Sequence, residues 1–480
     1  MAIGSTQPAV AGESAAPHLK RVLGTWDLTW LCVVAITNLN VVPVIASNGP
    51  VTTWLWLLAL AFFFWPQGIA VIELAQRYPA EGGIYIWAKE AFGDFHGFMC
   101  GWCYWTTNMF YIPTLLFYLA GIPAYIGGKA TAHLSSNSMF FFLLTTGLLW
   151  LILILNIRGL GVGKWINNLG GMGTMVAALV LIGLGVSVLL RGGAEFKMSD
   201  FGFGGDYQLI SAFGVICFGL VGLELGPVMG DEIHDPRRTV PKSVVYGGVL
   251  SGVLYVGATL SVLLSVPQRD VAVVQGVLQA VDRMTAGQNL GWILAPLAVL
   301  MATAIAGCVS AWSAGSARIM FVSGLDRYLP TALGQIHPRY NTPHIALTTQ
   351  AVVCTLLIAM SFIGAGVKEA YVTLLDLAVV LQMLSYLYLF GALLWLVRKG
   401  EHLYLRRAKL WFAAASGLAA TTLGMIVAFI PSHQITSIWT FEAKMIVSCV
   451  LFLGLGAGLF WYYSRRRRTA GPPITASTSA

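Results

Sequence analysis

The sequence predicts an all-α membrane protein with 12 transmembrane helices, arranged as two inverted five-helix repeats followed by two extra helices. Three observations lead to this fold class. Of the 480 residues, 57% are hydrophobic and only 10% are charged, whereas soluble domains carry about 25% charged residues. Apolar stretches of roughly 20 residues, each long enough to cross a bilayer core, recur along the whole chain. Two of these stretches, five spans apart, contain residues that break helices.

The twelve expected spans lie near residues 28–48, 52–77, 95–123, 138–156, 166–190, 207–231, 243–266, 290–322, 344–364, 370–397, 409–430 and 442–463. They form a single transmembrane domain over residues 23–464, in which the first repeat covers about 28–190, the second about 207–397, and the extra helices about 409–463. A tail of residues 1–22 precedes this domain and a tail of residues 465–480 follows it. Because residues 1–17 lack an apolar signal-peptide core, we expect the first span to be retained.

The basic residues predict the orientation. With the N-terminus inside, about three-quarters of the 28 Lys and Arg residues fall in cytoplasmic segments, as the positive-inside rule requires. They are spread over short loops, which argues against nucleic acid as a partner. We therefore expect a multi-pass protein of the cytoplasmic (inner) membrane, with both tails in the cytoplasm and the lipid bilayer as its surroundings. The oligomeric state stays open.

Several chemistries are missing from the sequence. The glycine-rich stretch Gly159–Lys164 differs from a phosphate-binding loop, because Arg158 replaces the first glycine and Trp165 the Ser or Thr. The eight histidines lie in loops or at span ends, so we expect no metal site. No Ser-His-Asp or Cys-His set is placed to meet at membrane depth. We therefore expect no enzyme activity and no cofactor, and a transporter driven by a gradient.

The two interrupted spans indicate where a substrate binds. The first contains Asn38, Asn40, Val41 and Pro43 near its middle, and the sixth runs from Phe218 to Pro227. Irregular backbone survives at membrane depth only where it lines a cavity. Broken helices at matching positions of two repeats are typical of a transporter site at the bilayer midplane. The alternative is a pair of kinked packing helices with small residues at their contacts.

Half-helix ends favour a ligand that carries both charges. Freed N–H groups attract a carboxylate and freed carbonyls attract an ammonium, so an amino acid suits such a site. A polyamine would instead require additional acidic residues in the cavity. Glu224 lies beside Gly219 and Gly222 in the second break. It either shapes the site or couples it to a proton, or it only caps freed backbone donors.

Three further polar residues are candidates for the same cavity. Asp376 lies two turns into the tenth span, where a cavity role and a packing role are both open. Thr107 and Asn108 lie in the third span and could face the cavity or join neighbouring helices.

Three sequence stretches resemble the amino acid, polyamine and organocation (APC) superfamily. They are Glu73–Gly93, Gly222–Pro241 and Asp326–Pro330, and the likeness extends along nearly all twelve spans. Residues 43–49, 112–118 and 271–280 are similar to the glutamate/GABA antiporter branch. Residues 65–67 and 108–118 also resemble plant polyamine permeases.

The resemblance implies a fold like the bacterial leucine transporter, with substrate between helices 1, 3, 6, 8 and 10. It also implies that Phe218 closes over the substrate and that Trp312 is a second aromatic gate. Two departures concern the mechanism. The first break lacks the usual glycine-rich sequence, and Thr174 stands where proton-coupled relatives have a lysine.

The resulting hypothesis is secondary active transport of an amino acid by alternating access, as an antiporter or a proton-coupled symporter. A polyamine or organic-cation permease of the same fold is the alternative. A membrane receptor that does not transport is a more remote possibility. The sequence does not identify the substrate or the coupling ion.

Overall fold

The computed structural model describes residues 21–127, 130–131, 133–134, 137–202, 210–286, 288–361, 367–400, 403–430 and 438–469. Most of both expected tails lies outside the described residues, and so do the expected span boundaries at residues 207 and 364. Within the described ranges the regular structure is helical, apart from one isolated bridge between Leu23 and Ile233. The all-α fold class is therefore confirmed.

The helices follow one another as α1 (Thr25–Ile36), α2 (Val42–Ala46), α3 (Thr52–Ala59), the π-helical turn η1 (Leu60–Phe64), α4 (Trp65–Arg77), α5 (Ile84–Phe92), α6 (Asp94–Ile126), α7 (Ser138–Ile157), α8 (Leu160–Leu190), α9 (Ser211–Gly219), α10 (Leu225–Val228), the 3₁₀ turn η6 (Gly230–Glu232), α11 (Pro236–Ser265), α12 (Gly276–Thr285), α13 (Leu294–Leu325), α14 (His344–Ser361), α15 (Val367–Lys399), α16 (Arg407–Val427) and α17 (Ile438–Thr469). The elements α3, η1 and α4 form one continuous helical run over Thr52–Arg77.

Ten helical runs in the described ranges are long and apolar enough to cross a bilayer. They coincide with ten of the twelve expected spans. The other two expected spans, 28–48 and 207–231, consist of short helices: α1 with α2, and α9 with α10. Both predicted interruptions are thus confirmed. The total of twelve crossings and the division into repeats stay predictions.

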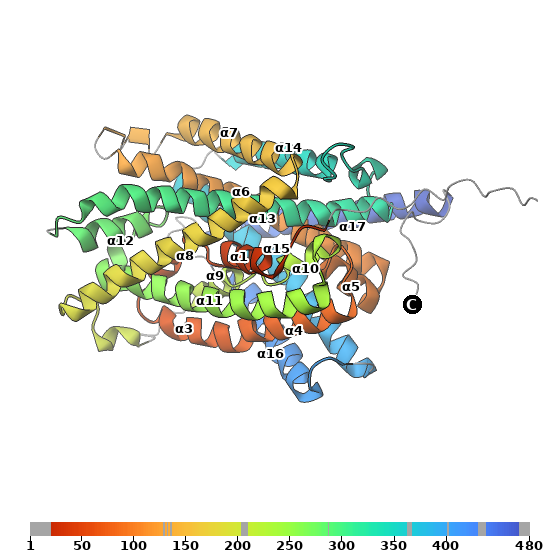
Figure 1. Cartoon of the computed structure of the whole chain (residues 1–480), viewed down its shortest axis with the longest axis horizontal. Coiled ribbons are helices and arrows are strands. Elements are labelled where there is room, and N and C mark those ends of the chain that lie inside the picture. The colour runs from red at the N-terminus through yellow and green to blue at the C-terminus, as the bar shows by residue number, and fades with distance from the viewer. Residues whose placement is uncertain are drawn as a thin grey trace, which may run out of the picture.

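The helices form a bundle whose centre is built by α6, α13 and α15 (Figure 1). The broken pairs α1–α2 and α9–α10 lie within this bundle, and α8 and α11 pack against α1. Helices α7 and α14 run together along one side of the view, and α16 packs on α4 at the opposite side. This arrangement places both breaks next to the three central helices.

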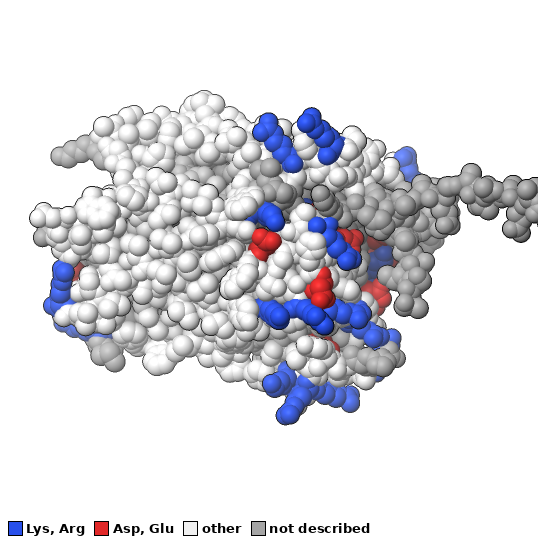
Figure 2. All heavy atoms as spheres, viewed as in Figure 1, with Lys and Arg blue, Asp and Glu red and all other residues white. Residues whose placement is uncertain are grey.

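Charged side chains avoid the middle of the face that Figure 2 shows. They gather over the end of the bundle that carries α5 and α10, with a smaller group at the opposite end. Large apolar side chains are exposed instead on the outward faces of α7, α8, α14 and α17, for example Leu143, Leu179, Leu356 and Leu451. An apolar belt between two charged ends is what a lipid-embedded bundle requires.

Candidate functional site

The first break begins where α1 ends at Ile36. The side chain of Asn38 turns back and donates from Nδ2 to the carbonyl oxygen of Ala35 at 2.7 Å. Helix α13 supplies two further donors, because Cys308 Sγ donates to Asn38 Oδ1 at 2.9 Å and Trp312 Nε1 donates to the Ala35 oxygen at 3.2 Å. Carbonyl groups freed by the end of α1 are thus satisfied by side chains. The break is therefore held to α13 at a defined position.

The second break is held by its own carboxylate. Glu224 is fully buried. Its Oε1 accepts from the Tyr104 hydroxyl at 3.1 Å, and its Oε2 accepts from Gln67 Nε2 and from the Gly222 amide, both at 3.1 Å. The hydroxyl of Tyr386 also donates to Oε2. Four donors from α4, α6, α15 and the break itself therefore converge on one carboxylate. The carboxylate is thus well satisfied within a buried polar network, in which Gln67 Oε1 is left without a partner among the described residues.

The two breaks lie directly against each other. Gly222 has φ +136°, a conformation that residues with a side chain rarely adopt. A Cβ atom at this position would lie 2.9 Å from the Ile36 side chain and 3.3 Å from that of Ala35. Gly219, at the end of α9, is equally close to Tyr255, whose hydroxyl would lie 2.8 Å from an added Cβ. Glycine at both positions lets the broken segments approach their neighbours closely.

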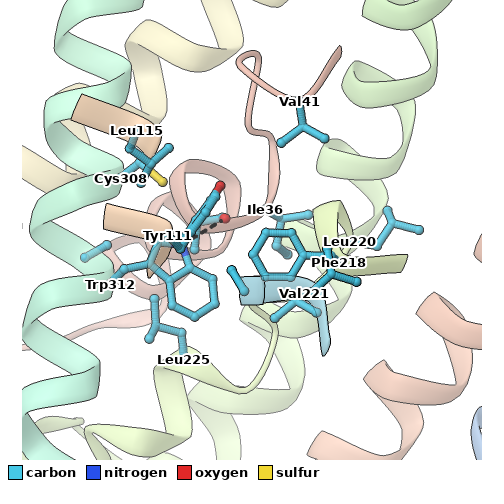
Figure 3. Packing of buried hydrophobic residues seen from close by; sticks show 14 of the residues in the cluster. Ile36, Val41, Tyr111, Leu115, Phe218, Leu220, Val221, Leu225, Cys308 and Trp312 are labelled. Atoms are coloured by element: carbon cyan, nitrogen blue, oxygen red, sulfur yellow. Dashed lines mark hydrogen bonds between the residues drawn. The ribbon is translucent and has the colours of Figure 1, made fainter. Parts of the chain in front are cut away.

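An aromatic cluster joins the two breaks (Figure 3). Phe218 meets Tyr111 edge to face with ring centres 4.9 Å apart, and Tyr111 meets Trp312 in the same way at 6.2 Å. Tyr104 lies 6.0 Å from Trp312. These rings come from α9, α6 and α13, so the cluster covers the space between elements that are distant in sequence. Edge-to-face pairs of this kind each stabilise a packing by about 0.5–1.5 kcal/mol.

Several buried polar atoms around the cluster have no hydrogen-bond partner among the described residues. They include Asn40 Oδ1, the Tyr111 hydroxyl and the Tyr255 hydroxyl. Tyr371 donates to the backbone oxygen of Asn40 at 3.0 Å and accepts from Asn40 Nδ2 at 3.4 Å. Buried polar groups are normally paired, so a group of unpaired ones needs an explanation. Unpaired acceptors and hydroxyls at one place are what a polar ligand would bind.

The predicted site residues do not all lie together. Asn38, Gly219, Gly222, Glu224, Phe218 and Trp312 meet around the breaks, as described above. Thr107 Oγ1 and Asn108 Nδ2 bond back to carbonyls of their own helix, Cys103 and Tyr104. Val41 donates to the Asn38 carbonyl within the break. The Pro43 ring packs on Gly276 of α12, where an added Cβ would lie 2.7 Å away.

Asp376 occupies a separate place. It lines a small cavity of about 30 Å³ together with residues of α2 and α9 and with Ala428, which follows α16. Neither the carboxylate network of Glu224 nor the aromatic cluster includes it. The site predicted from the sequence therefore combined two separate locations, the region of the two breaks and the position of Asp376.

A smaller cavity of about 10 Å³ lies beside the first break. It is lined by Thr37, Asn38 and Cys308, and by Thr174 on α8. The Thr37 hydroxyl is buried and has no hydrogen-bond partner among the described residues. Thr174 thus faces the break from the helix on which the resemblance places a lysine in proton-coupled relatives.

Several residues of the site were absent from the prediction, among them Gln67, Tyr104, Tyr111, Tyr255 and Tyr386. Tyr104 and Tyr111 are seven positions apart on α6 and therefore share one helical face. Their spacing was a usable signal, because buried tyrosines require partners. Gln67 and Tyr386 gave no such signal. They reach Glu224 from helices that are 157 and 162 positions away in the sequence.

Charged groups close the bundle end that carries α5 and η6. Arg318 of α13 is buried and binds Glu232 through two hydrogen bonds, of 2.6 and 2.9 Å, while its Nε lies 3.4 Å from Glu81 Oε1. Burial and the neighbouring charge of Glu232 raise the pKa of Glu81, and burial also raises the pKa of Glu232. The backbone of Leu23 exchanges hydrogen bonds with residues 232 and 234. The start of α1 is thus clamped to the loop after α10.

Comparison with known proteins identifies the family. The sequence profile described as "Amino acid permease" matches residues 23–455. The chain belongs to the amino acid permease family. The permease is therefore a multi-pass membrane transporter of small molecules, and the predicted APC resemblance is confirmed.

Individual relatives cover most of the permease. An uncharacterized transporter of Legionella pneumophila is 28% identical over 451 residues, which is 91% of this chain and 96% of the relative. A probable agmatine/putrescine antiporter of Lactococcus lactis is 24% identical and covers 76% of this chain and 77% of its own length. A glutamate/gamma-aminobutyrate antiporter of the same species is 23% identical and covers 84% and 83%. The predicted similarity to antiporters is thus confirmed.

Proposed function

We propose that this permease transports an amino acid across the cytoplasmic membrane by alternating access, as an antiporter or a proton-coupled symporter. The substrate binds between the two breaks, beneath Phe218 and beside Trp312. Three observations support this location: the breaks touch each other, an aromatic cluster spans them, and unpaired polar atoms surround that cluster.

One observation favours an amino acid over a polyamine at this position. A polyamine needs carboxylates, and the single carboxylate at the breaks, Glu224, already accepts from four protein donors. The unpaired groups around the breaks instead include the amide oxygens of Asn40 and Gln67 and the hydroxyls of Thr37, Tyr111 and Tyr255. An amide oxygen accepts from an ammonium and hydroxyls donate to a carboxylate. This set matches the two ends of an amino acid.

We further propose that the end carrying α5 and η6 faces the cytoplasm. The excess of Lys and Arg in the segments of that end supports this orientation. The contacts of Arg318, Glu81 and Leu23 then form the cytoplasmic gate in its closed state. Opening of this gate requires the contacts between Leu23 and the loop after α10 to separate. This clamp is therefore the element that opens and closes as the site alternates between the two sides of the membrane.

Uptake by proteoliposomes tests the proposal. Purified protein should accumulate at least one labelled amino acid, and it should do so faster when the vesicles are preloaded with amino acid if it exchanges. Tyr111→Phe should weaken apparent affinity by about tenfold, because one hydrogen bond to a charged group is lost. Tyr125→Phe, in the last turn of the same helix, is the matched control and should transport normally. Equal loss in both variants would refute the assignment of Tyr111.

The polyamine alternative has one supporting observation, the likeness to the agmatine/putrescine antiporter. Competition of uptake by putrescine, with no competition by glutamate, leucine or arginine, would favour it. Tight binding of an amino acid with no flux would instead select the receptor alternative.

A further inference from the structure

An open groove lies at the bundle end that carries α5, beside the ends of three helices. Its walls come from the last turns of α4, the first turn of α11 and the residues that precede α16, and its lining consists of Glu73, Gln76, Arg77, Arg237, Leu403 and Tyr404. The groove holds about 410 Å³, which falls within the range of small-molecule sites, about 300–1,000 Å³. It is separate from the aromatic cluster between the breaks, because the two share no residue.

Hydrogen bonds hold the walls of this groove together. Glu73 is buried, and its two carboxylate oxygens accept from the backbone amides of Tyr404 and Leu405 at 2.7 and 2.8 Å. Gln76 Nε2 donates to the carbonyl oxygen of Arg237, which ties the first turn of α11 to α4. The negative charge of Glu73 is thus engaged by protein donors. The groove is therefore formed before any ligand binds.

Basic side chains surround the groove. Arg77 and Arg237 line it, and Arg406 and Arg407 are exposed at the start of α16. Within the described ranges, Arg237, Arg406 and Arg407 take part in no ion pair. The segment 398–409 carries five basic residues and one acidic residue, and Figure 2 shows basic side chains gathered at this end of the bundle, also near the start of α16. The groove therefore attracts an anion.

The surface that continues from the groove along α4 and α16 is apolar. Trp65 of α4 and Phe412 of α16 are 49% and 52% exposed, and the ring of Phe412 lies 6.3 Å from that of the exposed Phe62. Trp65 lies eight positions before Glu73, which places it about 12 Å deeper along the helix axis. Exposed apolar side chains at this depth contact acyl chains, while a basic groove at their end contacts headgroups. A phospholipid fits both parts of this surface.

We propose that this groove binds the headgroup of an anionic phospholipid. The lipid phosphate pairs with Arg77 and Arg237, because guanidinium groups match phosphate oxygens in geometry and charge, and the acyl chains lie along the apolar face of α4 and α16. Basic pockets between spanning helices on the cytoplasmic side suit such headgroups, and the assignment to the cytoplasmic leaflet rests on the proposed orientation. Arg237 follows His234 by three positions, and the His234 amide donates to the Leu23 oxygen. The bound headgroup therefore ties the segment beside the proposed gate to α4.

Native mass spectrometry of the full-length, delipidated protein in detergent tests the site. The probe is dioleoylphosphatidylglycerol. Dioleoylphosphatidylcholine has the same chains without net charge, and glycerol 3-phosphate has the phosphate without chains. We expect the first phosphatidylglycerol to bind at least about tenfold more tightly than the first phosphatidylcholine, and glycerol 3-phosphate at the same concentration not to displace it. Equal affinities of the two lipids would overturn the proposal, and displacement by glycerol 3-phosphate would overturn the assignment to a lipid.

Two double variants locate the bound lipid. Arg77→Gln combined with Arg237→Gln should lower phosphatidylglycerol binding to the level of phosphatidylcholine, because both cations of the lining are lost. Arg158→Gln combined with Arg339→Gln is the matched control. It removes two exposed arginines near the start of α8, at the same end of the bundle but outside the groove, and should bind phosphatidylglycerol within twofold of wild type. An equal loss in both double variants would refute a site at the groove.

A further substitution keeps the test valid if the arginine variant of the groove does not fold. Tyr404 is 60% exposed, so Tyr404→Glu places a negative charge in the lining without disturbing the core. It should weaken phosphatidylglycerol binding at least fivefold and leave phosphatidylcholine binding unchanged, whereas Tyr404→Gln should retain both. Unchanged phosphatidylglycerol binding in Tyr404→Glu and in the arginine variant of the groove would overturn the proposal. Because no amino acid is present in these measurements, their outcome does not depend on the proposed transport function.

Discussion

Replacement of Glu224 by glutamine is the perturbation that the structure defines most closely. The carboxylate joins the second break to α4, α6 and α15 through bonds to Gln67, Tyr104 and Tyr386. Glutamine has nearly the same shape but carries no charge, and one of its two terminal atoms is a donor. The variant therefore changes the chemistry of the network and leaves its packing in place.

The expected loss can be worked out from the bonds. The amide oxygen of glutamine is expected to occupy the position of Oε2, which accepts three of the four donors, and its nitrogen then faces Tyr104, whose hydroxyl can rotate and accept. Bonds to a charged group contribute about 1.5–3 kcal/mol and bonds to a neutral group about 0.5–1.5 kcal/mol. Three weakened bonds thus cost about 3 kcal/mol. For a chain of this length, that corresponds to about 3 °C in Tm.

Thermal unfolding in detergent provides the assay. All seven cysteines are buried and free, so a thiol-reactive fluorogenic dye reports unfolding directly. We expect Glu224→Gln to lower Tm by about 3 °C and to leave the pH profile of transport unchanged, because the carboxylate acts as a fixed acceptor. An unchanged Tm combined with an altered pH profile would refute this reasoning and assign Glu224 to proton coupling.

Three further predictions follow from the site and the gate. Phe218→Ala and Trp312→Ala should each lower uptake at least tenfold with normal expression, whereas Ala at the exposed Trp165 should not; wild-type uptake in both would refute the aromatic gates. Gly222→Ala should cost about 1–3 kcal/mol, because its φ is +136° and its Cβ meets α1; a Tm equal to wild type would contradict the contact between the breaks. The raised pKa of Glu81 means that the folded state binds more protons than the unfolded state, so unfolding free energy should fall as the pH rises above 4.5; Glu81→Gln should flatten this dependence, and an equally steep profile would contradict it.

The sequence predicted the interruptions well because their cause is local. Pro43 cannot donate to a helix, and glycines with a carboxylate cannot form a regular apolar span, so both breaks follow from neighbouring residues. Phe218 and Trp312 were predicted only through the resemblance. The structure adds Tyr111 as the ring that connects them.

The partners of Glu224 were not predictable in the same way. Whether a buried carboxylate meets a cation, a proton or hydroxyl donors depends on helices that are more than 100 positions away in the sequence. The same limit applies to Asp376. Its depth along α15 suggested the central cavity, but the packing of α2, α9 and the end of α16 decides which space it faces.

The central claim is that this permease moves an amino acid through the site between its two breaks. Counterflow in proteoliposomes tests it most directly, with vesicles preloaded in turn with each standard amino acid and the same labelled amino acid outside. We predict transient accumulation of at least one amino acid by the wild type, reduced at least tenfold by Phe218→Ala. No accumulation of any amino acid, by protein that the thiol dye shows to be folded, would contradict the claim.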